Sequence, residues 1–148
     1  MQIQEPLIQH FSQLTKLYEE YLMFYNIRKP EKEISSFIQA RIIRRESLVW
    51  ICIDDQNDEV LGFVNVYPHF STLTLGSVWI LNDLFVKESG RGKGIGKVLI
   101  LKVLEEATKQ EIRSVHLETH HENHAAQKLY HSLNFKLNRH FLHYDYSV

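Results

Sequence analysis

The sequence predicts a mixed α+β fold in which helices cover both faces of a central, mostly antiparallel, twisted sheet of about six or seven strands. Three observations indicate this class. Two amphipathic segments precede the first β-rich runs, a long apolar run lies mid-chain, and a glycine-rich loop joins that run directly to another amphipathic segment. We expect residues 1–148 to form a single domain, because 148 residues with 44% hydrophobic and 24% charged residues are typical of one globular unit.

The first third of the chain predicts two helices after a short extended start at residues 1–5. Apolar residues recur at three-to-four spacing over residues 7–25, and Pro6 suits the first turn of such a helix. Pro30 interrupts the pattern, which resumes over residues 34–45 and there includes Arg41. These two helices would cover one face of the sheet.

The strands of the sheet follow. Residues 48–53 and 60–67 are β-rich runs separated by a polar turn, which predicts an antiparallel hairpin. The mostly apolar residues 75–86 indicate a central strand covered on both faces. Residues 114–118 indicate a further strand, and the aromatic tail, residues 135–146, predicts one or two last strands.

Two more helices complete the prediction. The first follows the glycine-rich loop, with its apolar positions between Ile95 and Leu104, and the second is short, over residues 123–133. The tail alternates like an exposed edge strand that could pair with a second subunit, so we hypothesise a homodimer.

Composition excludes several classes of protein. The 17 Lys and Arg residues against 18 Asp and Glu residues give a net charge of −1, so nucleic acid and anionic membrane surfaces are not expected partners. Cys52 is the only cysteine, so no intramolecular disulfide is expected, and a small core residue is its simplest interpretation. We expect a cytoplasmic protein without a signal peptide or membrane anchor.

The strongest local signal is the glycine-rich loop, which reads Arg91-Gly92-Lys93-Gly94-Ile95-Gly96-Lys97. Glycines at the start of a helix let backbone N–H groups close around a phosphate. The spacing does not match a Walker A loop, because Val98 stands where the hydroxyl residue should be, nor does it match the dinucleotide fingerprint. ATP hydrolysis and NAD binding are therefore disfavoured, and a glycine-rich turn without a ligand remains the alternative.

Two motifs, one around the glycine-rich loop and one downstream of it, together resemble those of a known family. The strand before the loop ends Asn82-Asp83-Leu84-Phe85-Val86, and a downstream segment reads Glu122-Asn123-His124-Ala125-Ala126-Gln127-Lys128-Leu129-Tyr130, followed by Leu133-Asn134-Phe135. With the Arg-x-x-Gly-x-Gly loop, this resembles the GNAT superfamily of N-acetyltransferases. The resemblance covers residues 60–135 well, the helices before them loosely, and is greatest to the diamine acetyltransferase and yeast histone and polyamine acetyltransferase branch. Asn134 stands where the family usually has glycine.

The resemblance implies an acetyl-CoA-dependent N-acetyltransferase with a GNAT-like fold. The residues implied to bind the coenzyme A pyrophosphate are Arg91, Gly92, Lys93, Gly94, Ile95, Gly96 and Lys97. The backbone of Leu84, Phe85 and Val86, together with Asn123, Ala126 and Tyr130, would bind the pantetheine arm.

The same resemblance implies two catalytic groups. The Leu84 N–H would polarise the thioester and stabilise the tetrahedral oxyanion, as in known oxyanion holes. Tyr130 would donate a proton to the departing thiolate. A half-buried aromatic residue whose hydroxyl only reaches water is the alternative interpretation of Tyr130.

The acceptor must lose a proton, because an alkyl ammonium with a pKa near ~10.4 is almost wholly charged at pH 7. Asn82 stands where this branch commonly has a glutamate base. Asp83 is the neighbouring carboxylate, although strand alternation predicts that it faces away from Asn82. The proton could pass through a chain of water molecules to Asp83 or His120. Alternatively, the amine could bind in its neutral form. Tyr25 completes the candidate acceptor residues.

The acceptor we expect is a small amine such as a polyamine, an amino sugar or an amino acid derivative. A protein lysine or an N-terminus is the alternative acceptor, and a non-catalytic module that binds coenzyme A is the alternative class. We expect no metal site, because the cluster of His120, His121 and His124 straddles a strand end and a helix start, and solvated histidines explain it.

Overall fold

The computed structural model describes all 148 residues, which form two compact units, Met1–Glu118 and Thr119–Val148. The elements of the first unit are β1 (Gln2–Gln4), α1 (Phe11–Phe24), α2 (Glu31–Ile43), β2 (Leu48–Asp54), β3 (Glu59–Ser71), β4 (Gly76–Val86), α3 (Ile95–Lys109) and β5 (Val115–Leu117), with short 3-10 turns at Ile8–His10 and Glu88–Gly90. The second unit contains α4 (His124–Ser132). A single domain over the whole chain stays a prediction.

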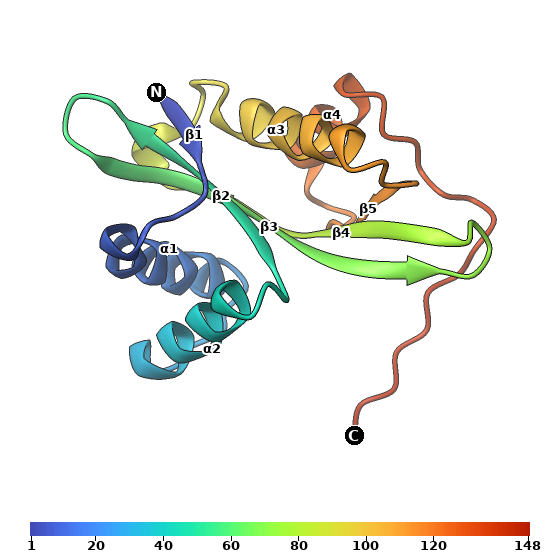
Figure 1. The fold of residues 1–148 in the computed structure, drawn as a ribbon, viewed down its shortest axis with the longest axis horizontal. Coiled ribbons are helices and arrows are strands. Elements are labelled where there is room, and N and C mark those ends of the chain that lie inside the picture. The colour runs from blue at the N-terminus through green and yellow to red at the C-terminus, as the bar shows by residue number, and fades with distance from the viewer. The chain divides into compact units, whose positions relative to one another are not determined.

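The five strands make one sheet in the order β1-β2-β3-β4-β5 (Figure 1). The pairs β1-β2, β2-β3 and β3-β4 are antiparallel, and β4-β5 is parallel. This confirms a mixed, mostly antiparallel sheet and the expected hairpin of β2 with β3. Strand β5 is parallel to its neighbour because α3 carries the chain back across the sheet before β5 begins.

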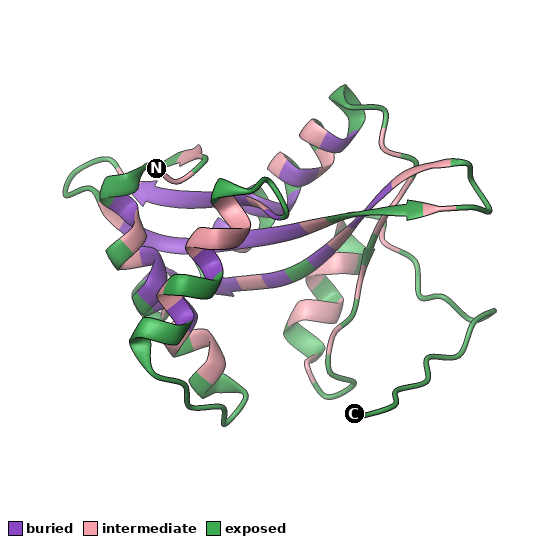
Figure 2. Ribbon diagram, turned by 60° about the horizontal axis from the view of Figure 1, so that its bottom comes forward, coloured by how far each residue is buried: buried purple, intermediate pink, exposed green.

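Helices cover both faces of the sheet in the first unit. Helices α1 and α2 lie on one face and α3 on the other (Figure 1). The first face has a core of aliphatic and aromatic side chains around Leu14, Tyr18 and Phe63. On the second face the buried Trp79 packs against Trp50, with the ring centres 6.0 Å apart. Figure 2 shows the consequence, since β2 and the first part of β3 are buried on both faces.

The starts of the first two helices differ from the sequence prediction. Helix α1 begins at Phe11 rather than near Leu7, because the buried His10 accepts a hydrogen bond from the Leu7 N–H at 3.0 Å and holds a 3-10 turn there. Helix α2 begins at Glu31, directly after Pro30, and acidic residues in its first turn complement the positive end of the helix dipole.

The expected strands in the tail are wrong. Residues 135–148 form neither helix nor strand, so the sheet has five strands rather than six or seven. An alternating pattern predicts which side chains would share one face of a strand. It does not predict a neighbouring strand with which the backbone could form hydrogen bonds, and a strand requires one. The tail's aromatic side chains are largely exposed.

No helix in the chain has the length and apolar character that crossing a bilayer requires.

Candidate functional site

The glycine-rich loop forms an open backbone cradle at the start of α3. Gly92 and Gly94 have φ angles of +74° and +78°, in the left-handed region that favours glycine. A Cβ atom on either residue would meet nothing within 4 Å, so the space in front of the loop is free. Gly94 is the N-cap of α3 and no side chain caps the helix. The N–H groups of the first turn are therefore available to an anionic ligand.

Arg91 adds a positive charge to this cradle. Its Nε donates to the carbonyl oxygen of Val86 at 3.1 Å, and its guanidinium lies 5.9 Å from the centre of the Phe85 ring. These contacts hold Arg91 against the end of β4. Lys93 and Lys97 are exposed and also cationic, so the loop has the donor set that a diphosphate requires.

The edge of β4 opens beside the cradle. Strand β5 pairs with β4 only at Trp79, Ile80 and Leu81, and it ends at Leu117. The second half of β4 therefore has no strand partner on the β5 side. Backbone donors and acceptors on that edge are available to an extended ligand.

A β-bulge lies where this edge opens. Asn65 of β3 pairs with Asp83, and the next residue of β3, Val66, pairs with Leu81, which leaves Asn82 as the extra residue. A bulge reverses the alternation of a strand from that point onward.

Two hydrogen bonds of the backbone show the reversal. The Trp79 N–H donates to Ser114 on the β5 side at 2.9 Å, whereas the Lys87 N–H donates to Leu61 of β3 at 3.0 Å. Both residues are odd-numbered, so an uninterrupted strand would send both N–H groups to the same side. After the bulge the even-numbered residues face the β5 side. The Leu84 N–H therefore points to the unpaired edge, as the resemblance implied.

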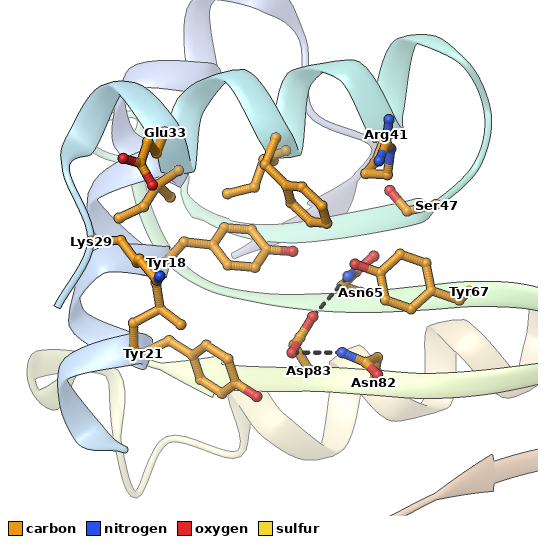
Figure 3. Close-up of a pocket in the computed structure, with 14 residues that line it drawn as sticks. Tyr18, Tyr21, Lys29, Glu33, Arg41, Ser47, Asn65, Tyr67, Asn82 and Asp83 are labelled. Carbon is orange, nitrogen blue, oxygen red and sulfur yellow. Dashed lines mark hydrogen bonds between the residues drawn. The ribbon is translucent and has the colours of Figure 1, made fainter. Parts of the chain in front are cut away.

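A pocket of about 510 Å³ lies on the face of the sheet that α1 and α2 cover (Figure 3). Four elements and two connecting segments contribute to its lining. The lining residues are Tyr18, Tyr21, Leu22, Lys29, Glu33, Ile34, Phe37, Ile38, Arg41, Ser47, Asn65, Tyr67, Asn82 and Asp83.

Asp83 is the buried charge of this pocket, with only 8% of its surface exposed. Its two carboxylate oxygens accept hydrogen bonds from the side-chain amides of Asn65, at 2.7 Å, and Asn82, at 3.0 Å. The expectation that Asp83 faces away from Asn82 is therefore wrong, because the bulge suspends alternation between them. Asn65 is 2% exposed, and its Oδ1 atom has no hydrogen-bond partner.

Three tyrosines stand around this carboxylate (Figure 3). Burial raises the pKa of Tyr18 and Tyr21 well above their usual value of 10, and the negative charge of Asp83 raises both further. Burial also raises the pKa of Tyr67. All three hydroxyls therefore stay protonated near pH 7 and can donate hydrogen bonds.

The second unit contains the downstream motif. Asn123 caps α4, since its Oδ1 accepts from the Ala126 N–H at 3.1 Å, and Tyr130 packs edge-on against Phe135 at 5.9 Å. Asn134 has a φ of +65°, and the Phe135 N–H donates to the Tyr130 carbonyl at 3.0 Å. Asparagine thus takes the left-handed position after the helix that glycine usually takes.

The exposed side chains of His120, His121 and Glu122 have potential ligand atoms within 4.8 Å of one another. The His120 and His121 rings stack at 4.5 Å, and no buried group supports the cluster. It has neither the enclosure nor the oriented partners of a typical metal site. The expectation of no metal stays a prediction.

The pocket contains some of the expected acceptor residues and not others. Asn82 and Asp83 line it. Tyr25 is 45% exposed and is not part of the lining, although its ring packs against Tyr21 at 5.2 Å. His120 lies in the second unit, so its acceptor role stays a prediction.

Sequence reasoning did not single out several polar residues of the pocket, and two of them, Asn65 and Arg41, interrupt an apolar pattern in a way that could have identified them. Asn65 is the one polar side chain in the apolar run of residues 60–66, and Arg41 falls on the apolar stripe of its helix. A polar residue in an apolar pattern indicates either a satisfied core group or a site.

Comparisons with known proteins agree with this geometry. The model of the acetyltransferase (GNAT) family matches residues 14–135. An uncharacterised N-acetyltransferase of Bacillus subtilis, YhfO, is 30% identical over all of this chain and 98% of its own. The D-amino-acid N-acetyltransferase HPA3 of Saccharomyces cerevisiae is 31% identical over 84% of this chain and 78% of its own.

A crystal structure of a probable acetyltransferase has a TM-score of 0.94 at 30% identity, covering 100% of this chain and 98% of its own. Together with the family model, these relatives show that the chain belongs to the GNAT family and is an N-acetyltransferase that uses acetyl-CoA as its acetyl donor.

Proposed function

We propose that the protein transfers the acetyl group to a small primary amine bound in the pocket under α1 and α2. The observation that carries this proposal is the buried Asp83 at the β4 bulge, one residue before the backbone N–H that faces the open edge of the strand. The pocket is bounded by helices on one side and the sheet on the other, which suits a small molecule better than a peptide. The yeast relative HPA3, a D-amino-acid N-acetyltransferase, adds support.

The donor half uses backbone groups. Arg91 and the N–H groups of residues 92–97 hold the pyrophosphate of acetyl-CoA in the open cradle. The unpaired edge of Leu84, Phe85 and Val86 binds the pantetheine arm as an additional strand would. The Leu84 N–H then donates to the thioester oxygen, where an oxyanion donor contributes about 3 kcal/mol to transition-state stabilisation.

The acceptor half uses Asp83. The ammonium group of the acceptor gives a proton to the Asp83 carboxylate, directly or through one water, and the neutral nitrogen attacks the thioester carbon. The C–N bond forms, the C–S bond breaks, and coenzyme A leaves as a thiolate. The nitrogen loses its second proton to solvent as the amide forms. No covalent enzyme intermediate is needed.

The resemblance assigns the remaining roles to three residues of the second unit. Tyr130 donates its proton to the departing thiolate, and Asn123 and Ala126 bind the pantetheine arm. Because the Asn123 Oδ1 already caps α4, its Nδ2 is the group left for the cofactor.

The test is thiol release from acetyl-CoA by the purified protein with polyamines, amino sugars, amino acids and lysine peptides, and mass spectrometry of the products. We expect an N-acetylated small molecule, and we expect Tyr130→Phe to reduce kcat by about 100-fold with an unchanged melting temperature. Turnover restricted to peptides would overturn the proposed acceptor class. Full activity of Tyr130→Phe would overturn its role as the acid.

A further inference from the structure

We infer that the acceptor is a zwitterion, an amino acid with an apolar side chain, and that Arg41 binds its carboxylate. This inference rests on the proposed function and names the substrate class of the same pocket. Four observations carry it: the balance of charge in the pocket, the free end of Arg41, the unpartnered oxygen of Asn65 and the apolar wall.

The charges that line the pocket balance. Asp83 and Glu33 oppose Arg41 and Lys29. Of these four, Asp83 is buried and Arg41 is partly buried, and Arg41 also forms an ion pair with Glu46, which lies outside the lining. A polyamine carries several positive charges and would need an excess of carboxylates. One buried acid and one half-buried base suit a ligand that carries one charge of each sign.

Arg41 is held in place but has nitrogen atoms to spare. It projects from α2, its guanidinium lies 5.1 Å from the centre of the Phe37 ring, and its Nε pairs with Glu46. A guanidinium has five N–H donors, so its two terminal nitrogens remain for a carboxylate. The buried Ser47 also lines the pocket and can add a hydroxyl donor.

The ammonium of the acceptor fits the opposite end of the pocket. Asp83 offers a negative charge there, and the buried Oδ1 of Asn65 lacks a donor. An ammonium has three N–H groups, so it can satisfy both acceptors at once. A buried acceptor left without a partner is costly, which makes this end of the pocket selective for a donor.

One wall of the pocket is apolar. It is formed by Leu22, Ile34, Phe37 and Ile38, with the Tyr18 ring below them. Such a wall favours an aliphatic or aromatic side chain on the acceptor. An amino sugar would leave its hydroxyl groups facing hydrocarbon.

The test compares acceptors that differ only in the carboxylate. Phenylalanine is paired with phenylethylamine, leucine with 3-methylbutylamine, each amino acid is tested as both enantiomers, and spermidine stands for the polyamines. Longer ω-amino acids, from β-alanine to 6-aminohexanoate, measure the separation of the two charged groups that the pocket prefers. We expect kcat/KM to favour an amino acid over its decarboxylated partner by at least about 10-fold.

Arg41→Gln should reduce kcat/KM for the amino acid by roughly 10- to 100-fold, mainly through KM, and leave the matched amine unchanged. Arg41→Lys should restore part of the preference, because charge remains without the planar fork. Lys32→Gln removes an exposed cation of α2 that does not line the pocket, and it is the matched control, with little expected effect.

Equal losses for the amino acid and the amine in Arg41→Gln would overturn the inference, as would a preference for spermidine or for decarboxylated amines. Either result would leave the proposed small-amine acetyltransferase standing. Turnover with no small amine at all would overturn the proposed function and the inference together.

Discussion

The donor cradle and the acceptor pocket present their binding groups in different ways. The cradle is one contiguous loop, Arg91 to Lys97, in which Gly92 and Gly94 border open space and no side chain caps the helix that follows. The pocket consists of side chains from α1, α2, β3 and β4. Backbone donors stay the same when side chains are substituted, so a backbone site keeps its ligand. A site made of side chains can bind a different ligand after a few substitutions. The two halves should therefore respond to mutation independently.

Asp83→Asn should have the largest effect and should be confined to the acceptor half. The variant keeps the shape of the side chain and one acceptor oxygen but cannot take a proton from the amine. We expect kcat to fall by about 10²- to 10⁴-fold, the range for a lost general base, with the Kd for coenzyme A unchanged. Steady-state kinetics and calorimetry measure the two quantities.

The matched control is Glu33→Gln, which removes the exposed carboxylate at the rim of the same pocket. It should change kcat by less than about threefold, since exposed charges contribute little. If Asp83→Asn weakened coenzyme A binding as much as it slowed turnover, the two halves would not be independent.

Gly94→Ala should have a smaller effect and should be confined to the donor half. The added Cβ meets no atom of the protein, so the cost is the left-handed backbone at φ +78°, about 1–2 kcal/mol. We expect the Kd for coenzyme A to rise about 10-fold, with the relative preference among acceptors unchanged. Gly92→Asn is the milder comparison, because asparagine tolerates this conformation better than alanine. An altered acceptor preference in Gly94→Ala would contradict the separation of the two halves.

The same contrast explains what sequence could predict. The cradle is contiguous, so its glycines, Arg91 and the following helix form one pattern in the sequence. The role of the Leu84 N–H was implied only by the family resemblance, and its direction depends on the bulge. The pocket depends on the bulge at Asn82, which no periodicity records, and periodicity alone therefore put Asp83 on the wrong face. Arg41 and Asn65 come from elements that only the folded sheet brings together.

The fold divides in the same way. The β2–β3 hairpin, the mixed, mostly antiparallel sheet and the helices on both faces follow from local patterns, whereas the pairing of β1 with β2, the pairing of β3 with β4 and the parallel direction of β5 come only from the structure. The structure of the tail does not follow from local patterns either, because its strands depended on a distant partner that alternation does not specify. The start of α1 depends on one hydrogen bond of His10, which is invisible to helix propensity.

The smallest predicted effect concerns the free energy of unfolding at high pH. It again distinguishes the two halves, because the pocket contains buried tyrosines that can ionise and the cradle contains no buried acid. Folding raises the pKa of Tyr18 and Tyr21 above the ordinary value of 10. A tyrosine with a raised folded-state pKa makes its full contribution to stability below pH 10. Above pH 10 the tyrosine ionises in the unfolded chain but not yet in the folded protein, so the contribution is lost as the pH rises toward the folded-state pKa. The free energy of unfolding should fall above pH 10 by about 1.4 kcal/mol per pH unit for each tyrosine.

Urea denaturation between pH 8 and pH 11 measures this slope. Tyr21→Phe should reduce it by one tyrosine's share, and Gly94→Ala should leave it unchanged, because the cradle contributes no buried acid. An unchanged slope in Tyr21→Phe would show that the hydroxyl ionises equally well in the folded state, which would contradict its burial beside Asp83.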